Sequence, residues 1–160
     1  MIKEATTLDI PFIQHIVKVT WPITYGKILS NVQINYMLEK IYANDSLTEQ
    51  MNNGHHFYLL MEDSGAIGFI DVEKISKRKT KLHKIYLLPD HQGKNYGKVL
   101  MGLAIEKAKE NNSDSLQLNV NRYNLALSFY LKQGFKIVEE VDIPIGNGYF
   151  MNDYIMEKAL

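Results

Sequence analysis

The fold of this chain can be read from one stretch, Ile85-Tyr86-Leu87-Leu88-Pro89-Asp90-His91-Gln92-Gly93-Lys94-Asn95-Tyr96-Gly97-Lys98. Its first four residues are apolar and stop at a proline, which is typical of the end of a strand. The segment from Gln92 to Gly97 predicts a turn, and apolar residues at helical spacing begin after Lys98. Backbone amides at a helix N-terminus have no partners within the helix, and the helix dipole is positive there. The stretch therefore predicts a strand-to-helix loop that can bind an anion such as a diphosphate, with Lys94 and Lys98 adding charge at its edge.

Two common nucleotide-binding patterns do not fit this loop. A P-loop ends in Gly-Lys-Ser or Gly-Lys-Thr, whereas Gly97-Lys98 is followed here by Val99. A dinucleotide-binding fold places its glycines in the first strand-helix unit, whereas this loop lies in the second half of the chain. On the loop alone, a strand-to-helix connection that binds no ligand is an equally good interpretation.

Hydrophobic periodicity on both sides of the loop predicts the other elements. Three helices are expected before the loop. The first is capped by Thr7, with one face made of Leu8, Phe12, Ile16, Val17, Thr20 and Trp21; the second is capped by Asn31 and buries Ile34, Met37, Leu38 and Ile41; the third has a capping box at Ser46–Glu49. They are followed by a hairpin of Phe57–Glu62 and Ala66–Ile75 and by a strand at Lys81–Leu88. The elements after the loop are a helix from Lys98 to about Asn111 that buries Val99, Leu100, Leu103, Ala104 and Ala108, a strand at Ser115–Val120, a helix capped by Asn124 that ends near Gly134, and strands at Phe135–Val141 and Phe150–Met156. This order predicts an α+β fold with a mixed central sheet, in a single domain over residues 1–160.

The composition excludes several classes of function. Lys plus Arg and Asp plus Glu number 18 each, so the formal net charge is zero, which argues against a nucleic-acid partner. The chain has no cysteine, and therefore no disulfide, thiolate metal site or cysteine nucleophile. No apolar run approaches the roughly 18 residues of a membrane span, and residues 1–6 do not resemble a signal peptide. We therefore expect no membrane partner and a cytoplasmic location.

A second motif follows the loop at Asn124-Leu125-Ala126-Leu127-Ser128-Phe129-Tyr130-Leu131-Lys132-Gln133-Gly134-Phe135. By itself it predicts an amphipathic helix with an asparagine cap and a glycine stop. At this separation, the two motifs together resemble those of the GNAT acetyltransferase superfamily. Gln92-x-x-Asn95-x-Gly97 corresponds to the acetyl-CoA signature of that family, in which a glycine usually stands at the position of Asn95. Asparagine tolerates left-handed backbone angles better than other non-glycine residues, so the loop geometry can be preserved.

The resemblance implies a GNAT-like mixed central β-sheet flanked by helices on both faces, and direct transfer of the acetyl group from acetyl-CoA to an amine. It places Ile85, Tyr86 and Leu87 along the pantetheine arm, with the Leu87 amide polarising the thioester carbonyl. The expected pyrophosphate ligands are the loop residues Gln92, Gly93, Lys94, Asn95, Tyr96, Gly97 and Lys98. Asn119 and Asn124 are expected to make further contacts with acetyl-CoA. Tyr130 corresponds to the general acid proposed for the family, or donates a hydrogen bond to the leaving sulfur; a core tyrosine is the alternative.

A narrower resemblance concerns the acceptor. Three segments resemble those of bacterial polyamine acetyltransferases of the PaiA type: Trp21–Gly26, Lys84–Leu87 and Asp153–Leu160. This resemblance implies spermidine, spermine or a related small amine as the acceptor. The alternatives are a protein N-terminus, a lysine, an amino acid, an antibiotic amine, or a non-catalytic module that binds CoA for regulation. Trp21, Tyr25 and Tyr36 could line the acceptor pocket or belong to the core. Members of the superfamily are often homodimers, so a homodimer is possible here.

The general base has several candidates. An alkyl amine with a pKa near ~10.4 must lose a proton before it attacks. Many members of the superfamily have a glutamate on the strand before the loop, where this chain has His83, which alternates in phase with Ile85 and Leu87 and could therefore face the site. The alternative candidates for the base are Glu62, Asp71, Glu73 or a chain of water molecules.

The remaining charged groups have simple interpretations. His55 and His56 are adjacent on a strand and should point to opposite faces, and no other ligand stands at suitable spacing, so we expect no metal. Lys77–Lys81 predicts a solvated hairpin tip, although it could also attract a phosphate of CoA. Two acidic groups could attract a polycation or simply be solvated; they are Glu39, Asp45 and Glu49, and Glu139, Glu140 and Asp142.

Overall fold

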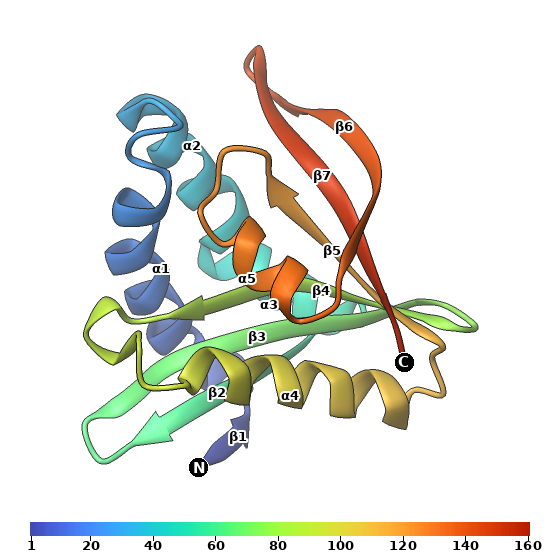
Figure 1. The fold of residues 1–160 in the computed structure, drawn as a ribbon. Helices are drawn as coiled ribbons and strands as arrows, with labels where there is room; N and C mark the ends of the chain where they lie inside the picture. Colours follow the sequence, from blue (N-terminus) through green and yellow to red (C-terminus); the bar gives the residue numbers. More distant parts are fainter.

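Seven strands form one mixed sheet in the order β1-β2-β3-β4-β5-β7-β6, in a computed structural model that describes residues 1–160 (Figure 1). The strands are β1 (Ile2–Glu4), β2 (His56–Glu62), β3 (Gly65–Ser76), β4 (Lys79–Leu87), β5 (Ser115–Asn121), β6 (Lys136–Gly146) and β7 (Tyr149–Ala159). The helices are α1 (Ile10–Tyr25), α2 (Asn31–Tyr42), α3 (Asn44–Asn52), α4 (Tyr96–Glu110) and α5 (Leu127–Lys132), with short 3-10 turns at Thr7–Asp9 and Pro89–His91. Neighbouring strands are antiparallel except for β4 and β5, which are parallel. The predicted α+β class and mixed sheet are confirmed.

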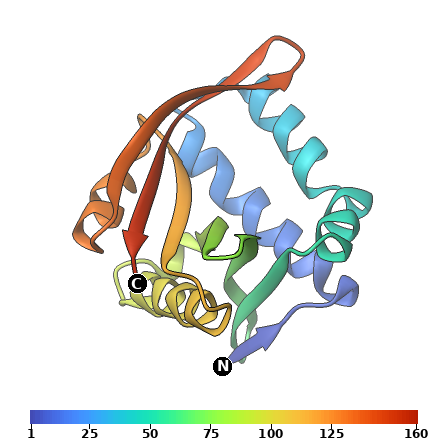
Figure 2. The same cartoon turned by 90° about the vertical axis from the view of Figure 1, so that its right-hand side faces the viewer.

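The helices bury both faces of the sheet. α1, α2 and α3 cover one face over a core that includes Ile13, Ile16, Phe57 and Phe69. α4 and α5 cover the other face over a second core that contains Leu100, Leu118, Tyr130 and Met156 among others. Figure 2 shows these two layers on opposite sides of the strands. None of the helices combines the length and apolarity that a membrane-spanning helix needs.

The first three helix starts differ from the expected ones, by one residue at the first two and by three at α3, whose N-cap is Ala43. The first helical turn is capped by Thr6, not Thr7, because Thr6 forms a capping box with Asp9. Ser30 caps α2 by accepting a hydrogen bond from the Gln33 amide, so Asn31 is the first helical residue. Ser46 lies inside α3. Short polar residues that stand side by side are chemically equivalent caps, and the sequence does not rank them.

Three apolar side chains expected in the core lie at the surface instead. Leu8 is 89% exposed because it belongs to the short turn before α1, and Phe12 is 39% exposed. Val99, in the first turn of α4, is 47% exposed. All three stand near a helix start, where the helical phase is set by the cap and where one turn is not yet covered by a neighbouring element.

The C-terminal strands are longer than predicted. β6 and β7 continue to a tight turn at Gly146–Gly148, and the tip of this hairpin lies beside α2 (Figure 2). The Tyr36 hydroxyl donates a hydrogen bond to the Ile145 carbonyl over 2.9 Å, and Gln33 donates one to the Phe150 carbonyl over 3.1 Å. Tyr36 therefore anchors the hairpin to the helical layer. β1, a three-residue edge strand, was not predicted because it is too short to show alternation.

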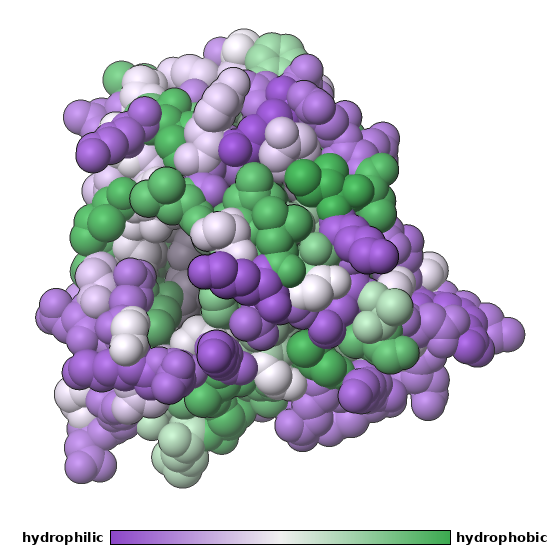
Figure 3. All heavy atoms as spheres, viewed as in Figure 1, coloured by the Kyte–Doolittle hydropathy of each residue, from purple (hydrophilic) through white to green (hydrophobic).

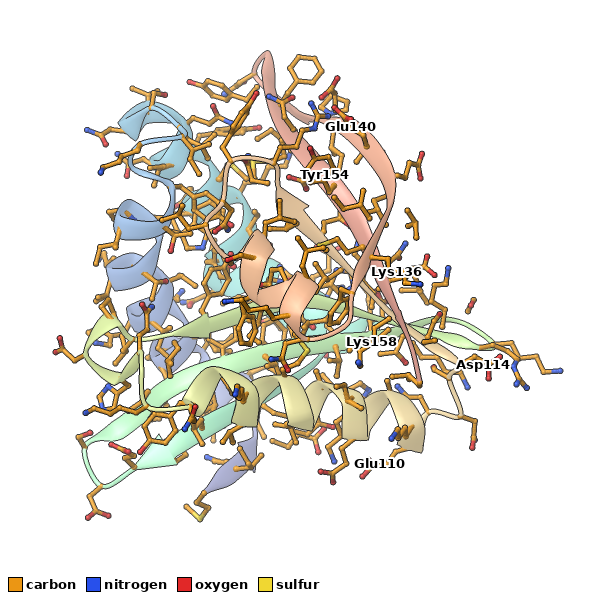
Figure 4. All side chains as sticks on the ribbon, viewed as in Figure 1. Glu110, Asp114, Lys136, Glu140, Tyr154 and Lys158 are labelled. Carbon is orange, nitrogen blue, oxygen red and sulfur yellow. The ribbon has the colours of Figure 1, made fainter.

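The hairpin tip expected at Lys77–Lys81 is confirmed for Lys77 and Arg78 only, between β3 and β4. The rest of this run belongs to β4, in which Thr80 is buried. Arg78 forms a two-point ion pair with Asp114, which precedes β5 and is labelled in Figure 4. Both side chains are largely exposed. The pair joins the β3–β4 turn to the start of β5, at the end of the sheet where β4 and β5 are hydrogen-bonded to each other.

Candidate active site

The site begins where the parallel strands β4 and β5 separate. They pair over four residue pairs only, from Lys79 with Ser115 to Leu82 with Leu118. Beyond these pairs the strands diverge, and their ends line a cavity of about 1140 Å³ between α1, the loop before α4, and α5. The space-filling view shows the surface hollowed on this side and bordered by apolar residues (Figure 3).

The loop at the start of α4 forms one end of this cleft. Gly93 has φ +78° and Asn95 has φ +66°, so both adopt the left-handed backbone that the sequence predicted for Asn95. The first hydrogen bond into the helix is donated by the Val99 amide to the Asn95 carbonyl, and the six amides of residues 93–98 have no acceptor within the protein. The first turn of α4 contains no acidic residue. A row of free amides at the positive end of a 15-residue helix fits a pyrophosphate.

The end of β4 presents backbone groups to the same cleft. The Leu88 amide donates to the Ile67 carbonyl of β3, and amides alternate in direction along a strand. The amides of Leu87 and Ile85 therefore point away from β3, toward the opening left by β5. Gln92 donates from its side chain to the Leu87 carbonyl over 3.2 Å, which ties the loop to the strand end.

Tyr130 lies on the cleft wall opposite β4. Its ring packs edge-on against Phe129 and Phe135 and is 8% exposed, and its hydroxyl has no hydrogen-bond partner within the protein. Burial raises the pKa of this phenol above its usual value near ~10. A phenol of raised pKa transfers a proton to a thiolate less readily but still donates a hydrogen bond. The hydroxyl of Tyr130 is thus free, on the wall of the cleft that the family resemblance predicts to face the thioester sulfur of acetyl-CoA.

The cleft brings most of the predicted site residues together. The lining includes Ile85, Tyr86, Leu87, Gln92, Gly93, Asn95, Gly97, Lys98, Asn119, Asn124 and Tyr130. Lys94 and Tyr96 do not line it. The Tyr96 hydroxyl instead donates to Glu62 on the outer side of the loop, so Tyr96 offers only its backbone amide to the cleft. Asn124 accepts a hydrogen bond from the Ala126 amide and so shapes the turn before α5, whose N-cap is Ala126.

Aromatic side chains form the opposite wall of the cleft. The hydroxyls of Tyr25 and Tyr86 are 3.3 Å apart, and the ring of Trp21 packs against both. Burial raises the pKa of both phenols, so they remain neutral. Tyr25 lines the cleft, Trp21 belongs to the core behind it, and Tyr36 lies at the β6–β7 hairpin instead.

One acidic residue beside the cleft was missed from the sequence. Asp153 on β7 is 6% exposed, and its carboxylate receives only a long hydrogen bond of 3.5 Å from the Asn119 side chain, which lines the cleft. One oxygen of each side chain, Asn119 Oδ1 and Asp153 Oδ1, has no partner. Burial raises the pKa of Asp153. An aspartate within an alternating strand gives no sequence signal of this kind, since its place beside the cleft comes from the separation of β4 and β5.

The four side chains considered as bases lie in different environments. Glu62 is on the outside of the loop, bonded to Tyr96. Asp71 is fully buried, and although burial opposes its ionisation, the hydrogen bond from His55 and the charge of Lys84 hold its pKa below the usual value. Glu73 accepts a hydrogen bond from His83, which lines the cleft, and burial lowers the pKa of His83 to about 4. A base this weak accepts a proton poorly from an ammonium ion of pKa near ~10.4.

The position of His83 differs from the one that strand alternation predicted. Asp71 is opposite Lys84 and Val72 is opposite Leu82, so a β-bulge leaves His83 without a cross-strand partner. The bulge breaks the alternation that related His83 to Ile85. His83 therefore lies with Glu73 and His55 at the rim of the cleft.

One of the acidic groups is partly neutralised. Arg122 forms ion pairs with Glu140 and Asp142 of β6, at 3.2 and 2.6 Å. These carboxylates lie on the exposed edge strand of the sheet.

Comparisons with known proteins agree with this geometry. A family model described as an acetyltransferase (GNAT) domain matches residues 27–149. The chain belongs to the GNAT acetyltransferase family. It is 31% identical to the spermidine N(1)-acetyltransferase of Thermoplasma acidophilum, over 98% of this chain and 95% of that one. It is 38% identical to the ribosomal protein bS18 alanine N-acetyltransferase of Haemophilus influenzae, but over 58% of this chain and 62% of that one.

A solved structure supports both the fold and the cosubstrate. The crystal structure of the PaiA N-acetyltransferase from Thermoplasma acidophilum in complex with coenzyme A is 28% identical, with a TM-score of 0.85 over 100% of this chain and 98% of that one. The GNAT protein described here is an acetyl-CoA-dependent N-acetyltransferase, and acetyl-CoA supplies the acetyl group as a reactive thioester. The GNAT fold and the cosubstrate predicted from the two sequence motifs are thereby confirmed.

Proposed function

We propose that this enzyme acetylates a primary amine of a small polyamine or diamine, with spermidine as the first candidate, by direct attack in a ternary complex. The observation that carries the proposal is the 31% identity to a spermidine N(1)-acetyltransferase along 98% of the chain. The similarity to an alanine N-acetyltransferase has higher identity but extends over 58% of the chain only. A protein N-terminus is therefore the second candidate acceptor.

In the donor half of the cleft, we assign the pyrophosphate to the amides of residues 93–98, assisted by Gln92 and by the charges of Lys94 and Lys98. The strand end Ile85-Tyr86-Leu87 would hold the pantetheine arm, with the Leu87 amide as donor to the thioester oxygen as negative charge develops there. Asn119 and Asn124 would add polar contacts. The support for these roles is the row of unpaired amides and the outward direction of the Leu87 amide.

In the acceptor half, we assign Asp153 to a cation of the polyamine. Its carboxylate is buried beside the cleft, accepts one long hydrogen bond and has one oxygen without a partner, so it can pair with an ammonium group of a ligand. The reacting amine must be neutral when it attacks, and a nearby carboxylate would raise its pKa and keep it charged. Asp153 therefore serves better as the partner of a second ammonium group, one that is not acetylated. An acceptor with at least two amines would use it fully.

A panel of acceptors tests the proposal by following CoA release with spermidine, spermine, a diamine, lysine, a peptide with N-terminal alanine, and butylamine as a monoamine. We expect spermidine to have the highest kcat/KM. In Asp153→Asn, the lost charged hydrogen bond is worth about 1.5–3 kcal/mol, so KM for spermidine should rise about 10- to 150-fold. KM for butylamine and for acetyl-CoA should change little.

Asp142→Asn is the matched control, because this exposed β6 carboxylate pairs with Arg122. A preference for the alanine peptide over every polyamine would refute the proposed acceptor. Equal loss with spermidine and butylamine in Asp153→Asn would refute the role given to that residue. The homodimer and the cytoplasmic location stay predictions.

A further inference from the structure

Three potential metal ligands converge at the rim of the cleft, on the face of the sheet that carries α3. His55 precedes β2, Glu73 lies on β3, and His83 lies on β4. Their ligand atoms all lie within 4.8 Å of one another. Glu73 Oε1 is 2.8 Å from His83 Nε2 and 3.6 Å from His55 Nε2. Two ligands of a tetrahedral zinc ion are about 3.3 Å apart when each is about 2.0–2.1 Å from the metal, so small side-chain rotations would place all three on one ion.

We propose that His55, Glu73 and His83 form a binding site for a divalent transition-metal ion of the zinc type. The proposal departs from the expectation of no metal, which rested on sequence spacing. His56, the neighbour of His55, does point the other way and contacts Glu4. The ligands that join His55 come from β3 and β4, which sequence spacing does not reveal.

The bulge in β4 creates the site. It adds one residue to β4 between the pairs Asp71–Lys84 and Val72–Leu82, and that residue is His83. Bulges commonly redirect a side chain in this way. As a result the rings of His83 and His55 stack with centroids 4.3 Å apart, and the Nε2 atoms of both rings lie near the same carboxylate oxygen of Glu73.

A buried carboxylate orients His55 from behind. Asp71 is fully buried, and its Oδ2 lies 2.7 Å from His55 Nδ1. If Nδ1 carries the proton and donates it to Asp71, the lone pair of Nε2 is directed at Glu73 and His83. A metal-bound histidine almost always donates its other ring N–H to such an acceptor, which fixes the ring and its tautomer. Asp71 is itself held by Lys84 Nζ at 2.6 Å. This support is independent of the three ligands.

The charges around the cluster indicate which class of metal fits. Lys84 neutralises Asp71, and Lys81 is the cross-strand partner of Glu73. The cluster is therefore not strongly anionic, and it offers one carboxylate and two imidazoles. Calcium and magnesium prefer shells of many oxygens, whereas imidazole nitrogen suits zinc, cobalt, nickel and copper. The three ligand side chains are 16–25% exposed, so a water molecule can reach a fourth position.

Metal binding would replace one hydrogen bond. His83 donates its Nε2–H to Glu73. When Nε2 binds a metal, that proton must move to Nδ1, which changes the tautomer of the ring without net loss of a proton. Glu73 then exchanges this hydrogen bond for a bond to the ion. A Cβ at position 54 would lie 3.5 Å from Glu73 Oε2, so the glycine found there leaves space for the movement.

The test is a titration of the full chain, without an added histidine tag and after treatment with a chelator, with Zn²⁺ in a calorimeter. We expect one ion per chain, and a Co²⁺-loaded sample with the visible absorption of a four-coordinate site. Glu73→Gln and His83→Gln should each weaken Zn²⁺ binding at least tenfold. Asp71→Asn should weaken it about 10- to 100-fold, as loss of an outer partner does. His56→Ala is the matched control and should bind as the wild type does.

Circular dichroism and thermal unfolding distinguish loss of the site from loss of the fold. Glu73 and His83 are partly exposed, so their glutamine variants should keep the wild-type spectrum. The proposal is overturned if the folded wild type takes up no stoichiometric Zn²⁺. It is also overturned if the folded Glu73→Gln and His83→Gln variants bind as tightly as the wild type, or if His56→Ala loses as much affinity as they do.

Discussion

Substitution of Asn95 separates what the backbone of the loop before α4 requires from what the side chain contributes. Asn95 has φ +66° and ψ +7° before α4, and its side chain makes no capping hydrogen bond. The left-handed conformation costs an ordinary L-residue about 1–2 kcal/mol, and asparagine tolerates it better than alanine. We therefore expect Asn95→Ala to lower the free energy of unfolding by about 1 kcal/mol. In a domain of this size that corresponds to a Tm about 2–4 °C lower.

Glycine should behave differently at the same position. It adopts the left-handed conformation without a steric cost, but its greater freedom in the unfolded chain costs about 0.5–1 kcal/mol. These effects nearly cancel, so Asn95→Gly should unfold within about 0.5 kcal/mol of the wild type. Calorimetric titration with CoA should give an unchanged or lower Kd for Asn95→Gly. Asn95→Ala should bind up to about fivefold more weakly, because about 1 kcal/mol opposes the loop conformation that presents the amides.

Asn112 provides the matched control. It has φ +59° just after α4, far along the chain from the loop. Asn112→Ala should lose a similar amount of stability and leave the Kd for CoA unchanged. Weaker CoA binding by Asn95→Gly would show that the asparagine side chain itself contacts the ligand. An Asn95→Ala variant as stable as the wild type would refute the conformational argument.

Two further variants probe the walls of the cleft. Tyr130→Phe should lower kcat and leave the Kd for acetyl-CoA nearly unchanged, since it removes one unpaired hydroxyl; an unchanged kcat would remove Tyr130 from the mechanism. Gly68→Ala would place its Cβ 2.8 Å from the Tyr86 carbonyl oxygen and 3.1 Å from Leu87 Cδ1. It should therefore cost about 1–3 kcal/mol in thermal unfolding and lower kcat through a displaced end of β4. Gly102→Ala on α4, whose Cβ meets nothing within 4 Å, is its control and should be neutral or stabilising.

Local chemistry made the structure of the loop before α4 predictable. The turn, the helix and the left-handed residue are all encoded within Gln92–Lys98, because each depends on neighbours a few residues away. The second motif ends as expected at Gly134, which has φ +92°. Hydrophobic alternation identified the sheet for the same reason. Exact helix starts were less predictable, since Ser30 and Asn31, or Thr6 and Thr7, can serve the same chemical role.

Features that depend on strand register were not predictable. His83 is at the rim with Glu73 because of a bulge, which depends on how β3 and β4 pair over many residues. Asp153 lies beside the cleft because it packs against Asn119, 34 positions away along the chain. Neither residue has a local signal, because alternation along one strand says nothing about its partner.

The short parallel ladder between β4 and β5 has a mechanical consequence. Within the sheet, β1–β4 and β5–β7 are joined by four residue pairs, so the sheet consists of two halves connected along a narrow strip. A ligand arm that forms hydrogen bonds with both diverging strand ends would add to this connection, and the two halves of the sheet would lose freedom to move relative to each other. Amide hydrogens should then exchange more slowly in the ligand-bound protein in both halves of the sheet, including strands that do not contact the ligand.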